Sequence, residues 1–199
     1  MDGIILAGGQ SRRFGYPKTF LPYQGKPFYQ WAIDRMQPFV DQIYFVTLQE
    51  HLPYIEDGLS NVHLMVDEPS LKGKGPLAGI FSAMNASNQD CFVTMPIDTP
   101  QLEGSVLHQL CLQPLDSYDA RIPIVNGKLQ PLIGLFHRSV HAVIREQLTR
   151  EQYSMQALVR KISVDYVMMD QTMDRYFHNI NTKEAYDQMT LDEYKRGLE

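Results

Sequence analysis

Runs of apolar residues alternate along the chain with segments whose apolar positions recur every three or four residues. Short apolar or β-branched runs predict buried strands, which we expect at residues 4–7, 43–47, 62–66, 91–95, 120–125, 129–136 and 164–168. The longer period and the flanking capping residues predict helices at residues 27–38, 53–59, 76–86, 105–111, 139–148 and 154–159. Near the C-terminal end, Thr182 is expected to cap a helix, and residues 190–193 form a capping-box pattern for a final one.

This alternation of strands and helices predicts an α/β fold. We expect three layers, with a mostly parallel twisted sheet covered by helices on both faces. The strand at 91–95 is almost continuously apolar and should be central in the sheet. At 199 residues the chain is expected to form one domain, residues 1–199. Ligands of such folds bind beyond the carboxyl ends of the strands, so the residues after each strand are the first candidates for a site.

The first strand ends in paired glycines, Gly8 and Gly9. Glycine is required where main chain approaches a ligand closely or takes a positive φ, and such turns present N–H groups to anions. The whole chain has a net charge of −5, but the basic side chains of its first thirty residues outnumber the single acid: Arg12, Arg13, Lys18 and Lys26 against Asp2. A basic loop on an acidic protein favours a small phosphorylated ligand, and we expect a triphosphate. The alternative is a glycine turn that binds nothing.

The predicted central strand is followed by Asp98, which stands between Pro96 and Pro100. A carboxylate fixed at this position faces the expected cleft. Because Mg²⁺ binds phosphates through one or two protein carboxylates, Asp98 is the predicted magnesium ligand. The alternative is an Asx turn in which the carboxylate bonds its own backbone.

Other strand ends add candidates for nucleotide contact. Thr47 closes the second strand, and Asp67 or its neighbour Glu68 follows the third, with Asp67 preferred. The glycine- and lysine-rich segment at 70–79 is either a linker or a loop that recognises the base. Asn179 and Asn181 point the same way on an extended chain, so their amides either bond a substrate or close a loop.

Composition and absent motifs exclude several function classes. The negative charge argues against nucleic acid and membrane surfaces as partners. Two cysteines make no disulfide framework, and no apolar stretch or leader of the kind that targets a membrane is visible, so we expect a soluble, cytoplasmic protein. The glycine loop lacks the dinucleotide and Walker patterns, which disfavours a dehydrogenase or a P-loop protein. The six histidines form no recognisable nucleophile pattern, which disfavours a triad hydrolase.

Residues 6–18, LAGGQSRRFGYPK, resemble the signature loop of nucleotidyltransferases that join a nucleoside triphosphate to a phosphorylated acceptor. Three more stretches narrow the resemblance to the molybdenum cofactor guanylyltransferases: Gly75 to Gly79 (GPLAG), Asp98 to Pro100 (DTP) and Asn179 to Thr182 (NINT). Together these motifs span most of the chain.

The resemblance implies a Rossmann-like nucleotidyltransferase fold and an activity. GTP and a phosphorylated molybdopterin would give the guanine dinucleotide cofactor and pyrophosphate, with Mg²⁺ as the metal. Residues 1–100 would bind the nucleotide and residues 101–190 the acceptor. Transient contacts with cofactor-delivering or molybdoenzyme-maturation proteins are implied as well. The alternatives are a related transferase with another triphosphate or a cytidylyl or sugar-phosphate acceptor, and a non-catalytic nucleotide-binding protein.

The resemblance also implies roles for individual residues. Those expected to act on the phosphates are the main chain of Leu6, Ala7, Gly8 and Gly9, the cations Arg13 and Lys18, and Asp98 with its metal. Those expected around the nucleoside are Gly75, Pro76 and Leu77, together with the strand-end candidates Thr47 and Asp67. Asn179 and Asn181 are expected to contact the acceptor.

Overall fold

The computed structural model describes residues 1–9, 14–56 and 60–196. Its strands are β1 (Asp2–Leu6), β2 (Pro22–Tyr23), β3 (Lys26–Pro27), β4 (Ile43–Thr47), β5 (Val62–Val66), β6 (Cys91–Pro96), β7 (Ala120–Val125), β8 (Lys128–Leu129), β9 (Gly134–His137) and β10 (Val164–Met168). Its α-helices are α1 (Phe28–Met36), α2 (Pro76–Ala86), α3 (Gly104–Cys111), α4 (Val140–Thr149), α5 (Met155–Val159) and α6 (Lys183–Arg196). Short 3₁₀ helices are η1 (Lys18–Phe20), η2 (Gln37–Phe39), η3 (Gln49–Tyr54), η4 (Pro69–Leu71) and η5 (Gln171–Phe177).

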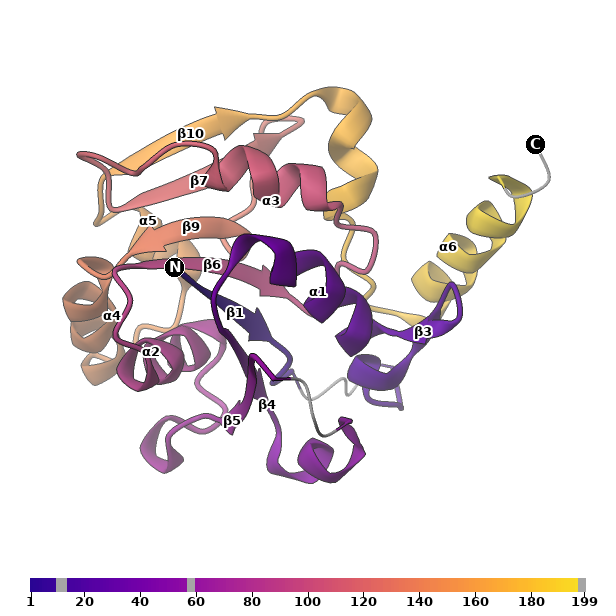
Figure 1. Cartoon of the computed structure of the whole chain (residues 1–199), viewed down its shortest axis with the longest axis horizontal. Coiled ribbons are helices and arrows are strands. Elements are labelled where there is room, and N and C mark those ends of the chain that lie inside the picture. Colours follow the sequence, from indigo (N-terminus) through magenta and orange to yellow (C-terminus); the bar gives the residue numbers. More distant parts are fainter. Residues whose placement is uncertain (10–13, 57–59, 197–199) are drawn as a thin grey trace.

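The main sheet has the strand order β10-β7-β9-β6-β1-β4-β5, with β8 added to β7 (Figure 1). Strands β5, β4, β1 and β6 are all parallel, and β9 runs antiparallel to both of its neighbours. The expected mostly parallel sheet and the central place of the strand at 91–95 are therefore confirmed. The chain moves outward from β1 through β4 to β5 and then returns to β6 on the other side of β1. This reversal places a crevice at the carboxyl ends of β1 and β6.

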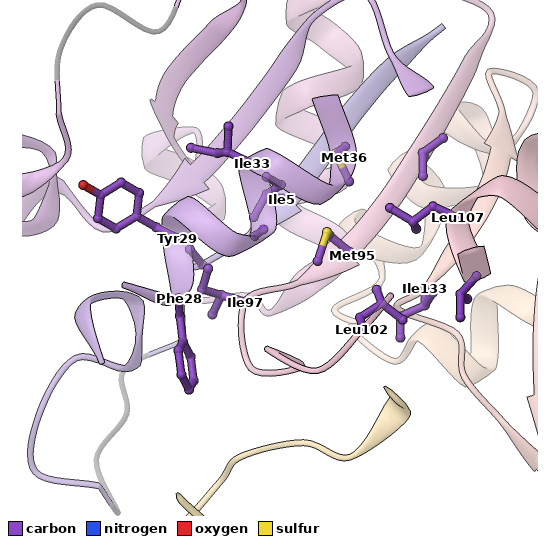
Figure 2. Close-up of a cluster of buried hydrophobic side chains, with 14 of the residues drawn as sticks. Ile5, Phe28, Tyr29, Ile33, Met36, Met95, Ile97, Leu102, Leu107 and Ile133 are labelled. Carbon is purple, nitrogen blue, oxygen red and sulfur yellow. The ribbon is translucent and has the colours of Figure 1, made fainter. Parts of the chain in front are cut away.

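Side chains of the central strands alternate between two cores. Ile5 of β1 packs with Phe28, Ile33 and Met36 of α1 on one face, where α3 also contributes (Figure 2). Ile4 points to the opposite face, which α2, α4 and α5 cover. This arrangement is the three-layer architecture expected from the sequence, and it fixes β1 and β6 rigidly between two apolar layers. Among the helices that the structure describes, none has both the length and the apolar character needed to cross a membrane.

The strand expected at residues 129–136 is divided in two. Only β8 and β9 are extended, and a turn separates them, in which the Ile133 N–H donates to the Gln130 carbonyl at 3.1 Å. Pro131 lies inside this turn. Its missing N–H and fixed φ suit a turn better than a continuous strand, which explains the break.

One expected helix start is wrong, and at another, where α4 does begin after Ser139 as expected, the side-chain cap is not formed. Residues 190–193 lie inside α6, and the Thr190 hydroxyl donates back to the Tyr186 carbonyl at 2.6 Å instead of capping a new helix. Ser139 precedes α4, but its hydroxyl is used on Asp119. The caps at Ser154 and Thr182 are confirmed, because their hydroxyls accept the N–H groups of Ala157 and Ala185.

The short helix expected at residues 53–59 is also displaced. The structure has the 3₁₀ helix η3 earlier, ending at Tyr54, with Pro53 inside it. Residues 57–59 lie outside the described part of the chain. The error arises because the sequence does not show whether Pro53 lies in the first turn of a helix or near its end.

Gly79 of α2 marks the closest approach of this helix to the sheet. A Cβ at Gly79 would lie 2.9 Å from Cδ2 of Leu6 and 3.3 Å from Cγ1 of Val46. We expect Gly79→Ala to lower the free energy of unfolding by about 1–3 kcal/mol, because overpacking outweighs the gain in helix propensity. Urea unfolding measures this loss. Gly104→Ala is the matched control, since its Cβ would meet only the Phe39 ring at 3.6 Å. A Gly79→Ala protein as stable as the wild type would contradict the close packing.

Candidate active site

The carboxyl ends of β1 and β6 meet at one place. Leu6 is paired with Pro96, and the Ile97 N–H donates to the Leu6 carbonyl at 3.0 Å. On the other side of β1, the Ala7 N–H donates to the Val46 carbonyl at 2.7 Å. The backbone that follows β1 is therefore fixed on both sides. The predicted glycine loop begins here, directly beside the segment that carries Asp98.

The glycine loop begins on an open surface. Gly8 and Gly9 are exposed, and a Cβ on either would have no atom within 4 Å among the described residues. Neither glycine has a positive φ. A positive φ is therefore not the reason for glycine at this turn, and close approach of a ligand stays a prediction. The predicted phosphate contact Arg13 lies in 10–13, outside the described residues.

Lys18 brings three distant segments together. It opens η1 after Pro17, and its Nζ lies 3.2 Å from Oδ2 of Asp98 and 2.7 Å from Oδ1 of Asn181. The side chains of Lys18 and Asp98 are only 13% and 20% exposed. A cation, a carboxylate and an amide thus converge beside the glycine loop, although they lie 80 and 163 residues apart in sequence.

Asp98 offers one carboxylate oxygen that the described residues leave unused. Its Oδ2 accepts from Lys18, whereas its buried Oδ1 has no hydrogen-bond partner in the described part of the chain. The Asx turn that the sequence left open would satisfy this oxygen from the backbone, and it is not formed. A buried, unsatisfied carboxylate oxygen is costly unless a cation or donor completes it. The donor chemistry therefore fits a magnesium ion.

The metal-ligand chemistry around Asp98 is sparse. Within the described ranges, no group of three or more histidine, cysteine, aspartate or glutamate side chains stands ready to hold a metal ion. This sparseness agrees with an ion that is bound through one protein carboxylate and the phosphates of a substrate. It disagrees with a preformed, all-protein metal cage.

The segment that contains the two asparagines is attached to Asp98. The Ile180 N–H donates to the Asp98 carbonyl at 2.8 Å, and the Ile180 side chain is buried. Asn181 reaches Lys18, while Asn179 is exposed on the same segment. Within the described part of the chain, Asn181 contacts another predicted site residue and Asn179 does not, and their contact with an acceptor stays a prediction.

Asp67 and Glu68 face different neighbours. The Asp67 carboxylate faces the backbone of Gly73, and burial raises the pKa of this carboxyl above its usual value. Glu68 turns to Asn85, whose amide donates to it at 2.8 Å. Of the two acids, Asp67 is therefore the one that contacts the segment before α2. In this segment Gly75 has φ +80° and ψ −169°, a conformation available essentially to glycine alone.

Pro76 and Leu77 begin α2 next to this glycine. Pro76 occupies the first helical turn, as expected, and is partly exposed. The Leu77 side chain is fully buried in the core below α2. Only the main chain of Leu77 is thus available to the predicted nucleotide site.

Thr47 lies at the end of β4 but is buried. Its Oγ1 is 3.1 Å from Nδ1 of His51, whose ring packs edge-on against Phe20 of η1 at 5.3 Å between centroids. Burial lowers the pKa of His51, so its imidazole is neutral at pH 7. The pair supports η1, which carries Lys18. Contact of Thr47 with a nucleotide stays a prediction, and the role of His51 had no signal in the sequence.

The backbone that follows Asp98 is also fixed by a contact with α1. Arg35 of α1 stacks on Trp31 with its guanidinium carbon 4.5 Å from the ring centroid, and it donates to the Pro100 carbonyl. A pocket of about 450 Å³ lies between α1 and α6 near this contact, lined by Trp31, Arg35, Gln101 and Glu193 among others. None of the predicted site residues lines it, so this pocket is separate from the candidate site at the carboxyl ends of β1 and β6.

The buried carboxyl of Asp67 gives a pH prediction. Because the pKa of Asp67 is raised in the folded protein, the unfolded chain releases this proton first as the pH rises above about 4. The contribution of Asp67 to folding therefore becomes unfavourable through that window and stays so at neutral pH. We expect Asp67→Asn to gain stability relative to the wild type between pH 4 and pH 7, as measured by urea unfolding at both. A stability difference that does not change with pH, or that falls, would contradict the burial of this charge.

Solved structures share the architecture of this protein. Molybdopterin-guanine dinucleotide biosynthesis protein A from Archaeoglobus fulgidus superposes with a TM-score of 0.81 at 24% sequence identity, over 98% of this chain and 100% of that one. A nucleotidyl transferase from Methanothermobacter superposes with a TM-score of 0.70 at 14% identity, over 98% of each chain. At these identities the likeness shows the fold, which is the Rossmann-like nucleotidyltransferase fold expected from the sequence.

The sequence then places the chain within this class. It belongs to the MobA-like NTP transferase domain family, whose family model matches residues 3–166. A relative from Bacillus cytotoxicus named probable molybdenum cofactor guanylyltransferase is 37% identical, over 92% of this chain and 93% of its own length. The resemblance stated from the motifs is thereby confirmed, and the protein is a nucleotidyltransferase.

Proposed function

We propose that this enzyme transfers GMP from GTP to a phosphorylated molybdopterin-type cofactor, giving the guanine dinucleotide form and pyrophosphate. The observation that carries the proposal is Lys18, whose ammonium lies between Asp98 and Asn181 next to the open glycine loop. The names of the relatives support the choice of GTP and acceptor. The site supports the chemistry, because it offers a cation, a carboxylate and exposed glycine residues where a polyphosphate must lie.

The nucleotide is proposed to lie along the carboxyl edge of β1. The main chain of Leu6 to Gly9 approaches the phosphates, and Lys18 with Arg13 opposes their charge. Pro76 and the main chain of Gly75 and Leu77 face the nucleoside, with Asp67 fixing their loop. An oxygen of the acceptor phosphate attacks the α-phosphorus, one P–O bond forms, and the bond to the β-phosphate breaks to release pyrophosphate. Positioning and charge neutralisation are the main work of the protein in such a transfer.

Asp98 is proposed to hold the magnesium ion. Its unsatisfied Oδ1 is the oxygen that fits this role. When bound, Mg²⁺ neutralises phosphate charge and orients the reacting groups. Lys18 remains beside the carboxylate to oppose the charge that develops on the leaving pyrophosphate.

The acceptor is proposed to approach from the side of Asn179 and Asn181, so residues 1–100 serve the nucleotide and residues 101–190 the acceptor. We place the reaction in the cytoplasm. There the enzyme would meet, in transient contacts, the proteins that deliver the cofactor or mature molybdoenzymes.

The test is pyrophosphate release with each of the four nucleoside triphosphates, Mg²⁺ and a molybdopterin acceptor. Release with GTP alone, dependent on both the acceptor and Mg²⁺, is the expected result. Release with CTP and a cytidylyl acceptor, or with a sugar phosphate, would contradict the proposed substrates. Tight GTP binding without any release would contradict catalysis itself.

A further inference from the structure

Among the described residues, the Lys18 ammonium lies closer to an amide than to a carboxylate. Nζ lies 2.7 Å from Oδ1 of Asn181 and 3.2 Å from Oδ2 of Asp98. Hydrogen bonds from a charged donor are among the stronger ones in proteins. Asn181 is thus a direct partner of the residue on which we place the main cationic role.

Asn181 is well placed to hold a lysine because its own backbone is anchored on both sides. Before it, the buried Ile180 donates its N–H to the Asp98 carbonyl. After it, Thr182 caps α6 through the Ala185 N–H at 3.2 Å.

The helix that follows Asn181 is itself tied to the N-terminal part of the chain. The Tyr186 hydroxyl of α6 donates to the Pro22 carbonyl at 2.6 Å, and the Tyr186 ring meets Phe14 at 5.9 Å between centroids. Figure 1 shows α6 leaving the body of the molecule beside the β2–β3 hairpin. The amide oxygen of Asn181 is therefore presented to Lys18 from a fixed position.

A lysine needs such a partner to act as a preorganised group. Its four-carbon stem carries considerable rotamer entropy, and an ammonium paired with one carboxylate is free to turn about that contact. A second acceptor on a different segment, such as Asn181 beside Asp98, restricts that rotation. We propose that Asn181 is a positioning residue for Lys18, so that it acts on nucleotide binding through the lysine in addition to any contact with the acceptor. The inference rests on the proposed function, because it assumes that Lys18 contacts the phosphates of GTP.

The test is a double-mutant cycle on GTP affinity, measured by calorimetry with Mg²⁺ and without any acceptor. We expect Asn181→Ala to raise the Kd for GTP about tenfold, the scale of one hydrogen bond to a charged group. In a Lys18→Ala background the same substitution is expected to change the Kd by less than about twofold, because its effect passes through the lysine. Asn181 is exposed, and urea unfolding of each variant checks that the fold is retained.

Asn179→Ala in the same cycle is the matched control, because this neighbour lies two residues away on the same segment and its effect should add to that of Lys18→Ala. An unchanged Kd in Asn181→Ala overturns the inference, and so does a loss of affinity that persists without Lys18. Failure of the proposed function is seen separately, since the wild-type protein would then give no binding heat with GTP.

Discussion

Replacing Lys18 by alanine is expected to lower kcat/KM for GTP by on the order of 10²–10³, the scale for loss of one preorganised charged group. The Lys18 side chain is only 13% exposed and is held by Asp98 and Asn181. Its ammonium therefore loses little conformational entropy when it contacts the phosphates. Truncation removes the cation and leaves the Asp98 carboxylate without its Oδ2 partner. Pyrophosphate release at varied GTP, with the acceptor saturating, measures the effect.

Lys26 provides the matched control for this substitution. It also pairs with an aspartate, Asp34, at 2.6 Å, but both side chains are more than a third exposed and neither is a predicted site residue. Exposed pairs contribute little, so Lys26→Ala should stay within about twofold of the wild type. Wild-type turnover in Lys18→Ala would remove this lysine from the mechanism.

Asp98→Asn is expected to lower magnesium-dependent turnover by about 10³ or more, since a neutral amide is a much weaker ligand for a hard cation than a carboxylate. The fold should be retained, because the amide has the same shape and keeps an oxygen that accepts from Lys18. The measurement is pyrophosphate release across a Mg²⁺ titration, with urea unfolding alongside.

Asp34→Asn is the matched control, because it also removes an aspartate that pairs with a lysine but is not a predicted metal ligand. Its Mg²⁺ response should match that of the wild type. An Asp98→Asn enzyme with an unchanged Mg²⁺ response would show that the ion is held by other groups. The orphaned Oδ1 of Asp98 would then need a different explanation.

The elements predicted best from the sequence are those whose local signals and tertiary environment agree. The bounds of β5, α2 and β10 agree residue for residue with the expected 62–66, 76–86 and 164–168. Each is bounded by turn residues or a proline and matches the period of its own structure. Where the signals conflict the prediction fails, as at Pro131, which interrupts an otherwise strand-like run.

Local capping patterns were less reliable than periodicity. The residues at 190–193 match a capping box, but α6 already extends through them because Thr182 caps it eight residues earlier. A helix already begun continues through a weak start signal, since its next residue adds a hydrogen bond at little cost. Sequence alone does not say which of two caps is used.

The candidate site was predictable as a set of residues but not as a geometry. The motifs named Lys18, Asp98 and Asn181 separately, and the strand-end rule placed two of them at one edge. Their mutual contacts depend on segments up to 163 residues apart, for which a single sequence carries no signal. For the same reason the sequence did not show that Glu68 contacts Asn85 while Asp67 faces the segment before α2, and the contact of Asp67 with the nucleotide stays a prediction.

The central claim is that the crevice at the ends of β1 and β6 holds the polyphosphate of GTP. A crystal structure with Mg²⁺ and a non-hydrolysable GTP analogue tests it most directly. The account predicts phosphates against the main chain of Gly8 and Gly9, within hydrogen-bond distance of Lys18 Nζ, with the ion on Asp98. A nucleotide bound elsewhere, or Lys18 and Asp98 paired with no phosphate or ion beside them, would contradict it.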